Sequence, residues 1–178
     1  FNRVFLAIKE ISKPLLVVQG MNDPRVRLLA LSQVQFHTGY HADLDRLGAA
    51  ARATDTFFVI DAIQALGHLP LDVRSTPVDI VACGAQKWLL SPWGSGFLYV
   101  RRELIPTLQS PFAGWTAFEG SDDFSTLLKY GEPLRADARR FELITLPFQD
   151  FLGMNLALDL LDELGVDRIA AHVARIGE

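Results

Sequence analysis

Apolar, β-rich runs alternate with segments of helical periodicity, and this alternation constrains the fold of the 178-residue chain more than any other feature. The runs at 28–36, 56–60 and 78–82 are typical of buried strands. Between the first two, residues 43–53 place leucines and alanines at helical spacing. Strands that alternate with helices favour βαβ units, so we expect an α/β fold with a mostly parallel sheet and flanking helices.

The segments after the third strand predict how the sheet ends. Residues 96–101 follow it after too short a connection for a crossover helix, so we expect an antiparallel pair. Short helices are expected at 62–66 and 103–108. The Gly- and Pro-containing stretch 110–140 is expected to be loop-like. A long helix is predicted from Pro147 to Gly165, followed by another from Val166.

Composition excludes several classes of protein. The chain is 49% hydrophobic and 21% charged, which is typical of a packed globular body. Its net charge of −4, without a basic run, argues against nucleic acid or a membrane surface as a partner. A single cysteine, Cys83, excludes an internal disulfide and a Cys-rich zinc site, and we predict no metal. The chain begins at Phe1 rather than methionine, so we interpret it as a piece of a longer protein.

Two ionisable residues lie at or just beyond the predicted carboxyl ends of strands. Asp61 follows the run 56–60, and Lys87 follows the run 78–82. Ligands of parallel α/β sheets bind at this edge, which makes the two residues candidates for a binding site. An ion pair that caps the sheet is the alternative, and Asp61 can also be the N-cap of the short helix expected at 62–66.

The sequences around these two residues resemble a known family. Asp61 lies in VIDAIQALGHLPLDV and Lys87 lies in VDIVACGAQKWLLSPWGSGFLYVRREL. Together they resemble the fold-type I pyridoxal 5'-phosphate (PLP) enzymes of the class V aminotransferase family. That family includes aminotransferases, cysteine desulfurases and isopenicillin-N-epimerase-like proteins. The resemblance implies that residues 1–165 belong to a PLP-binding large domain, incomplete at its N-terminus. It implies that residues 166–178 begin a helix leading toward a C-terminal small domain.

The resemblance also implies roles for individual residues. Lys87 matches the lysine that forms a Schiff base with the cofactor aldehyde, and we assign it as catalytic. Asp61 matches the acid beside the pyridine nitrogen, where a carboxylate favours the protonated ring. Gln64 matches the glutamine that hydrogen-bonds the phenolic oxygen of the cofactor.

Three further residues are expected to bind the phosphate. Gln86 stands where desulfurases usually carry histidine, and Gly84 stands where many members carry serine, so Gly84 offers only its backbone amide. Both departures favour an aminotransferase- or epimerase-like member. Thr145 follows an Arg-Phe-Glu sequence that resembles a family element reaching the phosphate of the neighbouring subunit, although Ile144 replaces its glycine. This last resemblance implies a homodimer with shared sites.

We therefore predict a cytoplasmic PLP-dependent class V aminotransferase that acts, through Lys87, on an amino acid or a related amine. Its partners are a small-molecule amino donor and acceptor, and a second copy of itself. A cysteine desulfurase, a selenocysteine lyase or an epimerase-like enzyme is the alternative within the same chemistry. A non-catalytic dimeric relative is the alternative from another class, although a binding module has no need to keep Asp61, Gln64 and Lys87 together.

Overall fold

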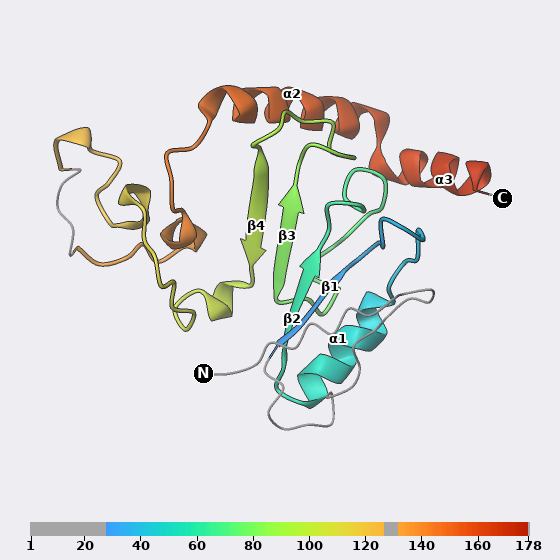
Figure 1. The fold of residues 1–178 in the computed structure, drawn as a ribbon, viewed down its shortest axis with the longest axis horizontal. Coiled ribbons are helices and arrows are strands. Elements are labelled where there is room, and N and C mark those ends of the chain that lie inside the picture. Colours follow the sequence, from blue (N-terminus) through green and yellow to red (C-terminus); the bar gives the residue numbers. More distant parts are fainter. Residues whose placement is uncertain (1–27, 127–131, 178) are drawn as a thin grey trace.

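The computed structural model describes residues 28–126 and 132–177, and these form one mixed sheet with helices around it (Figure 1). The sheet has the order β1-β2-β3-β4, in which the first three strands run parallel and β4 pairs antiparallel with β3. The strands are β1 (Leu28–Ser32), β2 (Phe57–Asp61), β3 (Ile80–Gly84) and β4 (Gly96–Val100). The predicted α/β class and the antiparallel last strand are confirmed.

Helix α1 (Leu44–Ala53) connects β1 to β2 and buries one face against the sheet. It begins where the Asp43 side chain accepts a hydrogen bond from the Arg46 backbone N–H at 3.0 Å, which satisfies one of the free amides of the first turn. Leu47 and Ala51, one turn apart, join the core with Phe58 and Ile60 of β2. The crossover therefore brings β1 and β2 together as parallel neighbours.

Helix α2 (Phe148–Leu164) crosses the end of the sheet at which β3 finishes, and α3 (Val166–Ile176) continues beyond it (Figure 1). Met154 and Leu161 of α2 are buried in the same core as the strands. The helices separate at Gly165, whose φ of +80° ends α2 as the sequence predicts. The division into a large domain and the start of a small one at this glycine stays a prediction.

Two predicted helices differ from the expectation. Residues 62–66 form a hydrogen-bonded turn instead of a helix, because the two backbone bonds of helical span here, from Leu66 N–H to the Ala62 carbonyl and from Leu69 N–H to the Ala65 carbonyl, are not consecutive. Isolated bonds of this kind do not offset the cost of helix nucleation, and Gly67 turns the chain with a φ of +107°. At 103–108 the structure has the 3₁₀ helix η1 (Arg102–Leu104), followed by a turn.

The described part of 110–140 is irregular, as predicted. It contains the short 3₁₀ helices η2 (Trp115–Ala117), η3 (Phe124–Thr126) and the start of η4 (Ala138–Phe141), together with an isolated antiparallel bridge between Phe118 and Leu134. Arg135 holds it together, because this buried side chain donates to the Thr116 carbonyl at 2.9 Å and to the Ser121 hydroxyl at 2.8 Å. Within the described ranges, no helix has the length and apolar character needed to cross a bilayer.

Candidate active site

Asp61 is the last residue of β2, at the carboxyl edge of the sheet, where it pairs with Ala82 of β3. One carboxylate oxygen accepts a hydrogen bond from the Ile63 backbone N–H at 2.9 Å, so the predicted capping role is present. The side chain is nevertheless exposed, because the chain turns away from the sheet at this point. The carboxylate therefore caps the turn and stays accessible to a ligand.

Lys87 lies in the loop that joins β3 to β4. Backbone hydrogen bonds close this loop, from Ala85 N–H to the Ser95 carbonyl and from Ser91 N–H to the Ala85 carbonyl, both at 3.0 Å. The Lys87 side chain is exposed, and it forms none of the ion pairs found among the described residues. The alternative in which Lys87 pairs with Asp61 to cap the sheet is therefore not what the structure shows, and the amine is accessible.

The turn after β2 lies directly against the Lys87 loop. A Cβ atom placed on Gly67 would come within 2.2 Å of the Trp88 carbonyl oxygen, so only glycine permits this approach. Beside it, the rings of His68 and Trp88 pack with their centroids 4.1 Å apart. Gln64, which is partly buried, lies in the same turn. The predicted Gln64 and Lys87 segments are thus in contact through their neighbours.

Gly84 and Gln86 occupy the same edge and pack against each other. A Cβ atom on Gly84 would lie 2.6 Å from the Gln86 side-chain oxygen and 3.0 Å from Cδ1 of Ile63. The end of the Gln86 side chain therefore lies in the space beside Gly84. A neutral amide, able to donate to an anion, thus stands at the end of β3.

Cys83 lies behind this edge, in the core. Burial raises the pKa of its thiol to about 11, and the negative charge of Asp61 adds to the effect. The thiol is only 4% exposed, so the prediction of a small apolar core residue is confirmed.

Thr145 is in a different place from the other predicted residues. It lies in the segment that leads into α2, and its hydroxyl accepts a hydrogen bond from the Trp115 indole N–H at 3.1 Å. Figure 1 shows this segment on the side of β4 that faces away from β2. The structure therefore gathers Asp61, Gln64, Gly84, Gln86 and Lys87 at one edge and leaves Thr145 outside that group.

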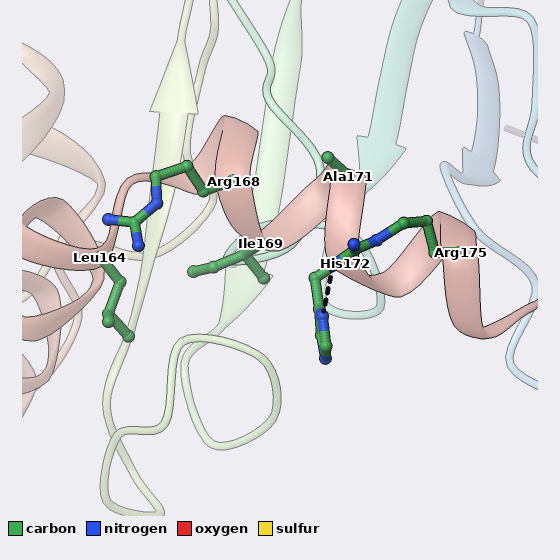
Figure 2. Close-up of a pocket in the computed structure, with 6 residues that line it drawn as sticks. All are labelled: Leu164, Arg168, Ile169, Ala171, His172 and Arg175. Carbon is green, nitrogen blue, oxygen red and sulfur yellow. Dashed lines mark hydrogen bonds between the residues drawn. The ribbon is translucent and has the colours of Figure 1, made fainter.

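The hollow of about 460 Å³ shown in Figure 2 is not this site. The end of α2 and one side of α3 line it, and they contribute no residue predicted to bind the cofactor. His172 Nδ1 and Arg175 Nη2 lie 3.1 Å apart there, so these two polar side chains are hydrogen-bonded to each other within α3. Its lining residues are Leu164, Arg168, Ile169, Ala171, His172 and Arg175.

Sequence reasoning missed His68 as a member of this region. Its side chain is buried, and its Nε2 lies 2.8 Å from the Gln64 carbonyl oxygen. The one available signal was its position four residues after Gln64, which places the two on the same side of a helical turn.

The family model for class-V aminotransferases matches residues 15–178. The chain belongs to the class-V aminotransferase family. This membership confirms the resemblance noted in the sequence and the fold class, and it confirms a PLP-dependent enzyme at the level of the family.

Individual relatives carry two kinds of name. An uncharacterised aminotransferase of Bacillus subtilis is 33% identical over 84% of this chain and 38% of its own length. A cysteine desulfurase of Klebsiella pneumoniae is 34% identical over 88% of this chain and 37% of its own length. The chain thus spans somewhat more than a third of the length of these relatives.

A solved structure of the lyase C-DES shares the fold. It is a lysine-to-alanine mutant with glycine covalently linked to its PLP cofactor, and it matches with a TM-score of 0.70 and 27% identity. The match covers 82% of this chain and 38% of that protein.

Proposed function

We propose that this chain is part of a PLP-dependent class V aminotransferase that acts on the amino group of an amino acid or a related amine. One observation carries the proposal. Among the described residues, an accessible carboxylate, Asp61, and an accessible amine, Lys87, stand at the same sheet edge without an ion pair between them, and two amide side chains accompany them. The division of the chain into a large domain, 1–165, and the start of a small domain, 166–178, forms part of the same proposal.

The donor set at this edge fits PLP. When bound, this cofactor supplies a ring that accepts electrons from the substrate Cα. The Asp61 carboxylate would keep the ring nitrogen protonated, because a nearby negative charge favours the charged form of that nitrogen. The Lys87 amine would hold the aldehyde and then carry the Cα proton on Nζ, as a flexible primary amine can.

The amides would orient the cofactor. The Gln64 side chain would donate to the phenolic oxygen, and the Gln86 amide together with the Gly84 backbone would donate to the phosphate. Thr145 would reach the phosphate held by a second copy, which accounts for its distance from the other five residues. The functional unit in this proposal is a homodimer.

Gln86 favours an aminotransferase over a desulfurase. It stands where the resemblance places a histidine in desulfurases, and its amide lies beside Gly84, which stands where many members carry serine. The Bacillus subtilis relative, with its aminotransferase name, supports the same choice. The Klebsiella pneumoniae desulfurase is about as similar, so desulfuration of cysteine is the second candidate function.

Borohydride reduction of the PLP-loaded, full-length protein tests the site. Peptide mass spectrometry is expected to find one pyridoxyl group, attached to Lys87. Lys87→Arg is expected to abolish the label, whereas Lys129→Arg, at another lysine of this chain, is expected to retain it. A label on a different lysine, or no label, would overturn the assignment.

The reaction is tested by offering amino donors to the same protein. An aminotransferase is expected to convert the donor into its 2-oxo acid while the cofactor is converted into its pyridoxamine form. Sulfur release and alanine formation from cysteine, without 2-oxo acid from any donor, would replace the first candidate with the second. No spectral response to any amino acid would favour the non-catalytic relative.

A further inference from the structure

His68 joins the two segments that carry the proposed cofactor residues. It lies in the turn after β2, four residues beyond Gln64, and it is 8% exposed. On one side, its Nε2 lies 2.8 Å from the backbone carbonyl oxygen of Gln64. On the other side, its ring packs at 4.1 Å on the ring of Trp88, which directly follows Lys87.

The chemistry of the contact assigns the proton on the ring. A carbonyl oxygen only accepts hydrogen bonds, so Nε2 must be the donor in the bond to Gln64. Nδ1 is buried and has no hydrogen-bond partner among the described residues. The imidazole is thus used for a single polar contact, the one that holds the Gln64 peptide, and for the ring contact with Trp88.

We propose that His68 is a positioning residue for the cofactor site. It orients Gln64 by holding its carbonyl, and it holds the turn against the Lys87 loop through Trp88. The close approach of Gly67 to the Trp88 backbone leaves little room for the turn to shift as a block. This inference rests on the proposed function, because it takes Gln64 as the residue that binds the phenolic oxygen.

Three substitutions in the full-length protein separate the two contacts. His68→Ala removes both of them. His68→Phe keeps a ring against Trp88 but loses the donor to the Gln64 carbonyl. His68→Gln loses the ring but keeps an N–H group near the place of Nε2. His172→Ala is the matched control, because His172 is an exposed histidine on α3 with a hydrogen bond of its own, to Arg175.

The first readout is the dissociation constant for PLP, measured on the apoprotein. His68→Ala is expected to weaken binding about tenfold, by analogy with the loss of roughly 10–100-fold when a residue that orients a metal ligand is removed. His172→Ala is expected to bind PLP as the wild type does.

The second readout is the pH at which bound PLP changes its visible absorbance. A donor to the phenolic oxygen draws negative charge from it. A misplaced Gln64 therefore leaves more charge on that oxygen, which stabilises the protonated form of the nitrogen that joins Lys87 to the cofactor. His68→Ala and His68→Phe are therefore expected to move the transition upward by about half a pH unit. His68→Gln is expected to remain near the wild-type value. A purely structural histidine would instead lower the thermal midpoint in all three variants without this pattern.

The outcomes distinguish this inference from the proposed function. If the wild type is labelled at Lys87 and the three variants bind and titrate PLP as it does, the role of His68 is refuted and the proposed function stands. If Lys87 in the wild type is not labelled, both fail. If His68→Ala does not fold, the pH transitions of His68→Phe and His68→Gln are compared instead. An upward shift in His68→Phe alone supports the role of His68, and equal transitions in the two variants refute it.

Discussion

Gly67→Ala tests the contact on which the arrangement of the candidate site depends. The added Cβ atom would meet the Trp88 carbonyl oxygen at 2.2 Å and its carbonyl carbon at 2.6 Å. These are backbone atoms, so the neighbour cannot yield by a change of rotamer. The turn that carries Gln64 must then move away from the Lys87 loop.

The expected cost has two parts. A left-handed backbone costs an L-residue about 1–2 kcal/mol, and φ at Gly67 is +107°. Forcing an extra methyl group into an occupied space costs about 1–3 kcal/mol. Together they predict a loss of about 3 kcal/mol in the free energy of unfolding. Gly39→Ala is the matched control, because φ there is +69° and no atom lies within 4 Å of the added Cβ, so only the first part applies.

Urea unfolding of the full-length protein measures the difference between the two variants. Gly67→Ala is expected to lower the midpoint clearly more than Gly39→Ala at an unchanged slope, because the slope reports the surface exposed on unfolding. It is also expected to reduce PLP uptake, whereas Gly39→Ala is not. Equal destabilisation by the two substitutions, with normal PLP uptake, would refute the close approach of the turn and the Lys87 loop.

Two further predictions concern the sheet behind the site. Asp79→Ala is expected to cost about 2–4 kcal/mol of stability, because the buried carboxylate accepts from the Phe58 backbone N–H at 2.8 Å and pairs with Arg101 at 3.0 Å. Urea midpoints check this, and an unchanged midpoint would show that the pair is dispensable. The pKa of Cys83 is about 11 in the folded chain against an ordinary 9.0, so its contribution to stability is complete below pH 9 and is lost as pH rises toward 11. Cys83→Ala is expected to remove that part of the pH dependence of stability. A thiol reagent at pH 8 is expected to label Cys83 in the wild type only after unfolding. Rapid labelling of Cys83 in the native protein would contradict its burial.

The sheet was predictable because buried strands appear in the sequence as continuous apolar runs. The strands at 57–61 and 80–84 lie within two residues of the predicted runs, since residues buried on both faces of a parallel sheet are apolar throughout. The length of the connection from Lys87 to Gly96 was enough to predict the antiparallel fourth strand. The turn at 62–66 was not predictable as such, because five residues with helical spacing do not reveal whether a helix nucleates.

The family motifs gave the site in outline. Asp61, Gln64, Gly84, Gln86 and Lys87 were all identified from their segments, and the structure brings these segments to one edge. Their roles toward the cofactor stay predictions. Thr145 was identified by the same kind of resemblance, yet within this chain it lies with Trp115, apart from the others.

The sequence by itself determined the strands, the long helices and the family, because each leaves a pattern among near neighbours in the chain, and it predicted the residues that would perform the chemistry. Only the tertiary structure decided that Gln86 fills the space beside Gly84, and that His68 packs on a ring 20 residues further along. Contacts of this kind depend on how two turns pack against each other in space, and the spacing of residues within either turn does not determine that packing.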